Sequence, residues 1–293
     1  MSAASFMKYL RYEKRFSPHT LIAYENDLRQ FFDFLSITYN ITNIAEGTHS
    51  IIRSWMVSMI EGGMNARSVN RKITALKTFY RYLIREGTIK TNPMQKIQSP
   101  KMAKRLPEFV DESNMDTLLD QTPFSNDFDG RRNILILEML YGTGIRRTEL
   151  VNLQQEDVNF HMGQIKVLGK RKKERIIPIN NELKQKIKEY LSEKDKLEQK
   201  DEEFLFVNKK GKKLTESVVY NVVKKYLSQV TTLQKKSPHV LRHTFATHLL
   251  NNGADLNAVK ELLGHANLSA TQIYTHNTIE RLKNIHKSAH PKA

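Results

Sequence analysis

Apolar residues recur at steps of three and four through the first third of the chain, which is the spacing of one helix face. Ser17 and Pro18 precede the first such series and suit the N-cap and first turn of a helix. The apolar positions of this series are Leu21, Tyr24, Leu28, Phe31 and Leu35. Two further helices are expected at about 51–60 and 66–86, and Gly87 ends the second of them. The pattern predicts a helical N-terminal domain.

The helix expected at 66–86 has two chemically different faces. Its apolar set is Val69, Ile73, Leu76, Tyr80 and Leu83. Its basic set is Arg67, Arg71, Lys77, Arg81 and Arg85. At about 100° per residue the two sets lie on opposite sides, so the helix can pack inward and still present cations outward. An ordinary solvated surface is the competing interpretation of the basic set.

The stretch 91–109 contains three prolines at intervals of seven and no sustained apolar period. We interpret it as a linker between a domain at 1–90 and a second domain at 110–293. In the second domain the helical period gives way at 158–178 to β-branched residues that flank a polar turn, which predicts a small hairpin or a three-stranded sheet. Helices are expected at about 112–120, 130–141, 146–153, 183–198, 216–229, 239–251, 256–263 and 279–286. The Lys- and Glu-rich stretch 193–203 is expected to be a solvated helix end and loop.

Charge changes this picture, because the 293 residues include 47 Lys and Arg against 31 Asp and Glu, a formal charge of +16. Such a balance points to a polyanionic partner. Residues 1–107 hold 17 basic and 7 acidic residues, so the helical domain is the more basic one. The absence of cysteine excludes disulfides, thiolate nucleophiles and Cys-based metal sites. No apolar run approaches the roughly 18 residues of a membrane span, and the N-terminus lacks the apolar core of a signal peptide, so we expect a cytoplasmic protein.

Histidines gather in the last part of the chain. Seven of the ten lie within the final 55 residues, at His239, His243, His248, His265, His276, His286 and His290. His239 and His243 have the spacing of a helical zinc pair, but Arg242 adds a cation on nearly the same face. Arginine together with histidine suits a phosphate group instead, because guanidinium matches phosphate oxygens bidentately and imidazole can donate or relay protons. We therefore expect an anionic ligand and no metal or cofactor.

Four separate motifs carry a resemblance to a known family. They are TGIRRTEL at 143–150, GKRKKER at 169–175, PHVLRHTFATHLL at 238–250 and LLGHANLSATQIYTH at 262–276. In this order and spacing they resemble the tyrosine recombinase family, and most closely its Xer group. The stretch SPHTLIAYENDLRQFFDFL at 17–35 is similar to the start of the family's helical core-binding domain, so the resemblance covers nearly the full chain.

The resemblance implies a role for each motif residue. The positions that match the family's catalytic residues are Arg146, Lys170, His239, Arg242, His265 and Tyr274. It implies that Tyr274 is the nucleophile, that Lys170 protonates the departing 5′ oxygen, and that His239 is either a base or a phosphate contact. The two arginines and His265 would bind the nonbridging phosphate oxygens.

Three further positions within these motifs affect the interpretation. Glu149 occupies the family's acidic position three residues after Arg146, and we assign it an orienting role. Arg171 stands where a glycine commonly follows the hairpin lysine, and Arg147 places a second cation beside Arg146.

The resemblance also implies a fold and partners. The fold is mainly α with a small antiparallel β-sheet, in which a helical, SAM-like core-binding domain and an α+β catalytic domain form a clamp around double-stranded DNA. The candidate DNA contacts are Arg67, Arg71, Lys77, Arg81, Arg85, Lys101, Lys104, Arg105, Arg171, Lys172 and Lys173. Four identical or paralogous protomers would act on two sites, with 277–293 supplying a helix to a neighbour and a DNA translocase of the FtsK type as a partner.

The reaction that the resemblance implies needs no metal, because the arginines and His265 meet the charge that develops on the phosphate. It needs no ATP, because a 3′-phosphotyrosine conserves the energy of the cleaved bond. The role implied by the Xer group is chromosome dimer resolution at cell division. Alternatives are a phage or mobile-element integrase with the same chemistry and a type IB topoisomerase. A non-cleaving basic DNA-binding protein, in which Tyr274 is inert, is the alternative from another class.

Overall fold

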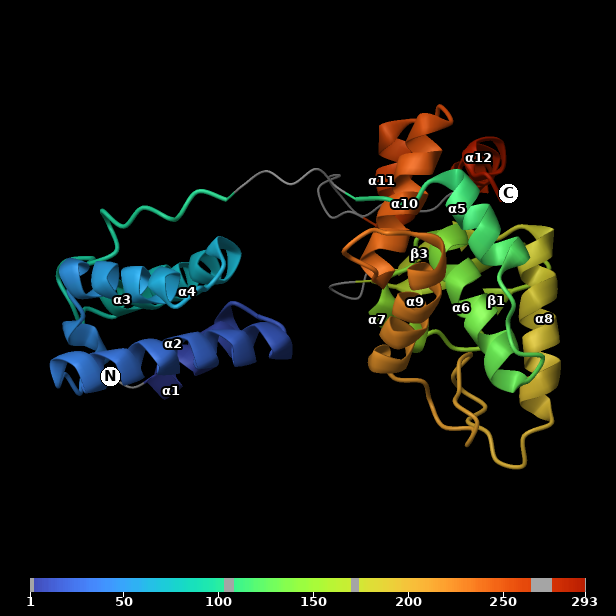
Figure 1. The fold of residues 1–293 in the computed structure, drawn as a ribbon. Coiled ribbons are helices and arrows are strands. Elements are labelled where there is room, and N and C mark those ends of the chain that lie inside the picture. Colours follow the sequence, from blue (N-terminus) through green and yellow to red (C-terminus); the bar gives the residue numbers. More distant parts are fainter. Residues whose placement is uncertain (1–2, 103–107, 170–173, 265–275, 293) are drawn as a thin grey trace. The chain divides into compact units, whose positions relative to one another are not determined.

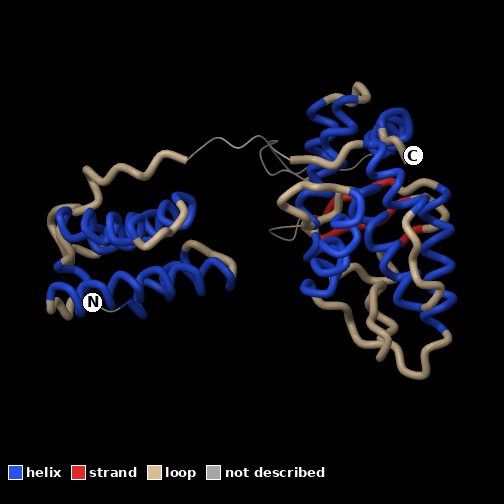
Figure 2. Tube along the Cα trace, viewed as in Figure 1, coloured by secondary structure: helices blue, strands red, loops and turns tan. Residues whose placement is uncertain are grey.

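The computed structural model describes residues 3–102, 108–169, 174–264 and 276–292. The chain divides into two compact units, Met1–Arg105 and Leu106–Ala293, which are coloured blue to cyan and green to red in Figure 1. Helices dominate both units, and the strands form one small sheet in the second unit (Figure 2). Within the described ranges no helix is long and apolar enough to cross a membrane.

The N-terminal unit is built of helices joined by short turns. They are α1 (Ala3–Lys8), continued by the short π-helix η1 (Tyr9–Glu13), then α2 (Pro18–Tyr39), the 3-10 helix η2 (Ile44–Glu46), α3 (His49–Glu61) and α4 (Ala66–Arg85). Helix α2 begins as predicted, since the Ser17 hydroxyl accepts a hydrogen bond from the Thr20 backbone amide at 3.3 Å. It ends at Tyr39, and the C-cap residue Asn40 that follows adopts the left-handed conformation with φ 54°.

The apolar face of α4 lies at the centre of the N-terminal core. Its predicted positions Val69, Ile73, Leu76, Tyr80 and Leu83 are all buried, which confirms this face. Helix α1, which the periodicity did not predict, adds Phe6 to the same core.

The first part of the expected linker also packs on the N-terminal unit. Met94 and Ile97 are buried in the N-terminal core. The Asn70 side-chain amide donates to the Pro100 carbonyl at 3.0 Å, which fixes the chain on the far side of these two residues. The chain therefore leaves the N-terminal unit only after about residue 100.

The second unit surrounds a three-stranded sheet with helices. The strands are β1 (Val158–Asn159), β2 (Gln164–Leu168) and β3 (Glu174–Pro178). The helical elements are α5 (Glu112–Asp116), η3 (Thr117–Gln121), α6 (Phe128–Thr143), α7 (Arg147–Val151), α8 (Asn181–Asp195), α9 (Glu216–Val230), α10 (Pro238–Asn251), α11 (Leu256–Leu263) and α12 (His276–Ala289). The strands pair antiparallel in the order β1-β2-β3, with Ile165 opposite Ile177. Of the two expected arrangements, the three-stranded sheet is the one that forms.

Two apolar clusters hold this unit together. The main core contains Leu137 of α6, Ile187 of α8 and Leu241 of α10, all fully buried. A smaller cluster joins α10, α11 and α12, and it includes Phe245 and Leu282. Figure 1 shows these three helices gathered at one end of the unit.

The stretch 193–203 differs from its predicted solvated state at one residue. Lys194 is fully buried, and its Nζ donates to the Phe204 carbonyl at 2.6 Å. Burial of the ammonium lowers the pKa of Lys194. The prediction was wrong for this residue because the aliphatic stem of a lysine can enter a core when its head finds a backbone acceptor.

The C-terminal helix α12 packs on its own unit. Leu282 is buried beside Phe245. The Nε2 atoms of His286 and His290 lie 2.7 Å from the Gly142 carbonyl oxygen and 3.2 Å from the Tyr141 carbonyl oxygen. We expected 277–293 to supply a helix to a neighbour, whereas within one chain this buried side of the helix contacts α6 and α10.

The buried histidines of α12 make this packing sensitive to acid. Burial, followed by the nearby His286, lowers the pKa of His290 to about 3 from an ordinary value of 6.5. The unfolded chain therefore binds the extra proton between these two values, so stability falls as the pH drops below 6.5. At pH 5 the expected loss from His290 is about 2 kcal/mol. Urea unfolding at pH 7 and pH 5 measures this loss.

A non-titrating side chain separates this effect from general acid sensitivity. His290→Gln should shrink the stability difference between the two pH values, whereas His161→Gln, at an exposed position, should leave it unchanged. An equal pH dependence in the parent and His290→Gln would show that His290 does not cause it.

Candidate active site

The turn between α6 and α7 places Arg146. Helix α6 ends at Thr143, and Gly144 follows in the left-handed conformation with φ 59°. A Cβ on Gly144 would lie 2.5 Å from a ring carbon of Phe245, so only glycine fits this position. Arg146 is then the N-cap residue of α7.

Glu149 fixes the orientation of Arg146 through two contacts. Its Oε2 accepts from the Arg146 backbone amide at 2.8 Å, as an N3 glutamate does in a capping box. Its Oε1 accepts from Arg146 Nη1 at 2.7 Å. The Arg146 side chain is 22% exposed and that of Glu149 only 5%, so the arginine is the member of the pair that reaches solvent.

A second arginine, Arg175 on β3, holds Glu149 from the opposite side. Its Nη1 and Nη2 donate to the two carboxylate oxygens of Glu149, each at 2.8 Å. Burial acts to raise the pKa of Glu149, but the hydrogen bonds and charge of Arg175, helped by Arg146, outweigh it and lower that pKa to about 2. Glu149 is therefore ionised at neutral pH.

Arg242 lies in α10 with its guanidinium buried. Nη1 donates to the Gly144 carbonyl, and Nη2 donates to the Leu263 carbonyl at 2.5 Å. Burial and then the nearby charges of Arg146 and Arg175 lower the pKa of Arg242 to about 9, which still leaves it protonated at neutral pH.

The last carbonyls of α11 connect the three arginines. The Leu262 carbonyl accepts from Arg175 Nε at 3.0 Å. The next carbonyl, of Leu263, accepts from Arg242, and that of Gly264 accepts from Arg146 Nη2 at 3.3 Å. Carbonyls at a helix C-terminus lack intrahelical partners and carry partial negative charge, so they suit cationic donors. Three successive carbonyls thus bring three guanidinium groups together.

The other predicted catalytic residues are placed only in part. His239 is exposed in the first turn of α10, three residues before Arg242. Lys170, His265 and Tyr274 lie outside the described residues, as do Arg171, Lys172 and Lys173. Across the part of the chain that is described, no three side chains of the metal-binding types lie close enough to hold a metal ion.

Arg147 and Arg175 differ from what the motifs suggested. The side chain of Arg147 pairs with Glu216 at 2.5 Å, so this second cation is engaged elsewhere. Arg175 closes the motif GKRKKER but was not among the predicted site residues. A signal for it existed, because alternation along a strand places Arg175 on the same face as the buried Ile177.

Comparison with known proteins gives the family. Residues 108–281 match the phage integrase family, and residues 3–87 match the phage integrase N-terminal SAM-like domain. The chain is 42% identical over 293 residues to tyrosine recombinase XerC of Oceanobacillus iheyensis, covering 99% of this chain and 95% of that protein. The chain is a tyrosine recombinase of the phage integrase family. The recombinase is also 40% identical over 291 residues to tyrosine recombinase XerD of Listeria monocytogenes, covering 98% of each.

Solved structures confirm the fold class of the recombinase. XerH site-specific recombinase bound to a palindromic difH substrate matches with a TM-score of 0.73 at 24% identity, covering 96% of this chain and 82% of that one. The Tn1549 transposon integrase in complex with circular intermediate DNA matches with a TM-score of 0.71 at 22% identity, covering 94% and 96%. At these identities the likeness shows the fold: a helical N-terminal domain and a catalytic domain with a small sheet.

The predicted basic face of the recombinase lies on α4, but two of its members are paired. Arg71 contacts Asp27 at 2.5 Å, and Arg85 contacts Glu13 at 3.0 Å. The same Asp27 is buried and also binds Lys72 at 2.9 Å, a second pairing that the helix period does not predict.

The remaining cations of this face are available for a partner. Arg67 and Arg81 are exposed and Lys77 is half-buried, and none of the three has an ion-pair partner among the residues described. Lys101 is exposed beyond Pro100, while Lys104 and Arg105 lie outside the described residues.

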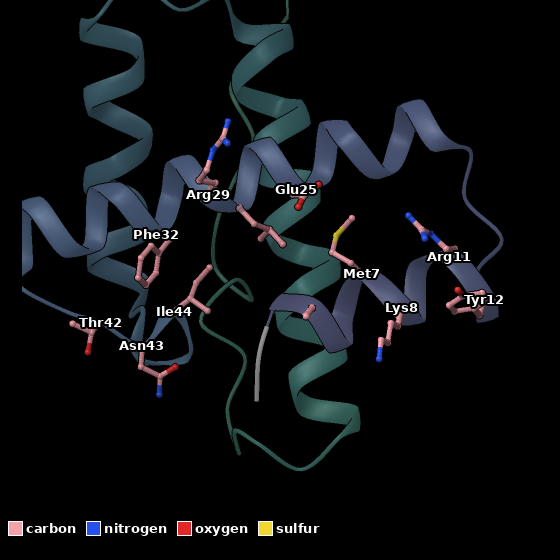
Figure 3. A pocket seen from close by; sticks show the side chains of 12 residues that line it. Met7, Lys8, Arg11, Tyr12, Glu25, Arg29, Phe32, Thr42, Asn43 and Ile44 are labelled. Carbon is pink, nitrogen blue, oxygen red and sulfur yellow. The ribbon is translucent and has the colours of Figure 1, made fainter.

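A cavity of about 790 Å³ lies in the N-terminal unit, between α1 with η1 and α2. Figure 3 shows Met7 and Phe32 at its apolar wall and Arg11 at its edge. The arginine cluster belongs to the other unit, and none of its members lines this cavity.

Proposed function

We propose that this recombinase resolves chromosome dimers at cell division by cleaving and rejoining double-stranded DNA at a specific site. The observation that carries the chemistry is the cluster of Arg146, Arg175 and Arg242 at the end of α11, in which Arg146 and Arg175 share the Glu149 carboxylate and Arg242 binds the Leu263 carbonyl. The chromosomal role is supported by the full-length similarity to proteins named XerC and XerD.

Arg146 and Arg242 bind the nonbridging oxygens of the scissile phosphate. A phosphodiester resists attack because its negative charge repels nucleophiles and its alkoxide is a poor leaving group. Guanidinium groups held in place before the reaction stabilise the charge that develops in the pentacoordinate transition state. His265 donates a further hydrogen bond to the same oxygens, so no metal ion is required.

Tyr274 attacks the phosphorus, and Lys170 protonates the oxygen that leaves. A phenol has an ordinary pKa near 10, so it must lose its proton during attack. His239 takes that proton, or it contacts the phosphate while a water molecule takes the proton. Its exposed place one turn before Arg242 suits either role. Lys170 gives a proton to the departing 5′ oxygen as the phosphorus–oxygen bond breaks. The 3′-phosphotyrosine that forms rejoins to another strand without ATP.

The assembly follows from the same proposal. The domains at 1–90 and 110–293, joined by 91–109, close around duplex DNA as a clamp. Four protomers, identical or paralogous, act on two sites in the cytoplasm, with a DNA translocase of the FtsK type as a further partner. In that assembly α12 would leave α6 and α10 of its own chain and make the same contacts with α6 and α10 of a neighbouring protomer.

Sequencing of covalently trapped DNA tests the chromosomal role. Cells are denatured rapidly, and DNA still linked to the recombinase is recovered and mapped. We expect one chromosomal locus that lies outside any mobile element. Recovery of element borders would favour the integrase, dispersed sites would favour a topoisomerase, and no linked DNA would favour a non-cleaving protein.

Salt dependence tests the basic face of α4. Replacing Arg67, Lys77 and Arg81 with Ala should weaken DNA binding and flatten the slope of log affinity against log salt. The expected change in slope is about 0.9 for each of these residues that neutralises a phosphate, because each contact releases condensed counterions. Titration of labelled duplex at several salt concentrations measures it.

A matched variant carries the same loss of charge at another surface. Lys188, Lys210 and Lys212 are exposed in the second unit, and replacing them with Ala also removes three positive charges. This variant should keep most of the parent slope. Equal slopes in the two triple variants would place the contact surface away from α4.

A further inference from the structure

We propose that Arg175 is a positioning residue of the active site, which acts through Glu149 on Arg146. This inference rests on the proposed role of Arg146 as a ligand of the scissile phosphate. Arg175 itself does not touch the substrate, since its side chain is 4% exposed.

The hydrogen bonds of Arg175 define where Glu149 lies. The parallel pair to Oε1 and Oε2 fixes the plane and the distance of the carboxylate, which a single contact would not do. The same two oxygens accept the Arg146 side chain and the Arg146 backbone amide. A shift of the carboxylate would therefore move the Arg146 guanidinium with it.

Charge gives Arg175 a second effect on the site. If Arg146 were the only partner of Glu149, the pair would be neutral overall and its attraction for phosphate would be weak. With Arg175 the group has two cations and one anion, so a net positive charge remains where Arg146 reaches solvent. Arg175 thus allows Glu149 to orient Arg146 without cancelling its charge.

Arg175 also connects this group to the end of α11. Its Nε donates to the Leu262 carbonyl, and a Cβ on Gly264 would lie 2.9 Å from its Cδ. The left-handed Gly264, with φ 63°, lets the chain pass this side chain closely. Arg175 thus contacts the same backbone segment, 262–264, whose carbonyls bind Arg146 and Arg242.

The experiment compares two substrates whose scissile phosphates differ in charge. In a methylphosphonate one nonbridging oxygen is replaced by a methyl group, which removes the negative charge and the need for a cation at that oxygen. Arg175→Lys keeps a positive charge but loses the planar fork. We expect it to bind duplex DNA like the parent and to form the covalent complex on phosphodiester at least tenfold more slowly.

The methylphosphonate distinguishes positioning from damage to the fold. The methylphosphonate has two stereoisomers, and the test uses the one on which Arg146→Ala regains activity. On this substrate Arg175→Lys should form the covalent complex within about threefold of the parent's rate. A tenfold defect that is the same on both substrates, or no defect on either, would overturn the inference. Arg132→Lys is the matched control, because Arg132 is also a buried arginine of this unit. It pairs with Asp129 at 2.7 Å and makes no contact with Glu149. It should form the covalent complex at the parent rate.

Failure of the inference is distinct from failure of the proposed function. If the parent forms no covalent complex on either substrate, the proposed chemistry is wrong. If the parent is active and Arg146→Ala is slow while Arg175→Lys is not, only the role of Arg175 is lost.

Discussion

Tyr274→Phe is expected to abolish the covalent protein–DNA complex and to leave DNA binding intact. The substitution keeps the aromatic ring and removes the oxygen that would bond to phosphorus. Loss of an enzyme's nucleophile lowers turnover by factors on the order of 10⁶, so no complex should be visible on denaturing gels. Native gels with the same duplex measure the retained binding, because that depends on cations and not on the phenol.

The matched control for this variant is Tyr220→Phe. Tyr220 is a tyrosine of α9 that is 37% exposed, so its substitution also removes one phenol oxygen and should leave the covalent complex at the parent level. A covalent complex that persists in Tyr274→Phe would assign the nucleophile to another residue. Loss of binding together with the complex would give Tyr274 a structural role instead.

The helices of this recombinase were predictable because their signal is local. The apolar steps of 66–86 need only the helical period, and the structure gives α4 at Ala66–Arg85 with the predicted face buried. The sheet at 158–178 was visible from β-branched residues around a polar turn. Helix α1 was not predicted, since six residues span fewer than two turns and show no repeat.

Buried charges were not predictable in the same way. Lys72 and Lys194 are both buried, against the usual preference of lysine for the surface. Lys72 is stabilised by Asp27, which is distant in the sequence, and Lys194 by the Phe204 carbonyl. Such pairs depend on tertiary contacts, which a helical period does not contain.

The active site likewise contains residues that the motifs identified and one contact that only the tertiary structure shows. The motifs identified Arg146 and Arg242, which share the end of α11 in the structure. The contact of Arg175 with Glu149 joins a strand to a helix end through side chains, so spacing along the chain gave no measure of it. Whether α12 packs on its own chain or on a neighbour depends on which apolar surface its buried side contacts. The sequence pattern leaves open whether that surface belongs to the same chain or to a neighbour.

Lys170→Ala is expected to slow strand cleavage by about 10²–10⁴-fold, the usual contribution of a general acid. The defect should largely disappear on a substrate whose bridging 5′ oxygen is replaced by sulfur. A thiol has an ordinary pKa near 8.5, far below that of an alcohol, so a thiolate can leave without a proton. Single-turnover formation of the covalent complex on the two substrates measures this rescue, which should reach within about tenfold of the parent.

Arg146→Ala is the comparison that makes the rescue by sulfur specific. Its expected loss is about 10²–10³-fold, because it removes a donor aimed at the nonbridging oxygens. The charge on those oxygens remains whichever atom leaves, so sulfur at the bridging position should restore Arg146→Ala much less than Lys170→Ala. Equal rescue of both variants, or none for Lys170→Ala, would contradict this division of roles. Selective rescue of Lys170→Ala would establish that protonation of the leaving group and stabilisation of the phosphate charge are carried by separate residues.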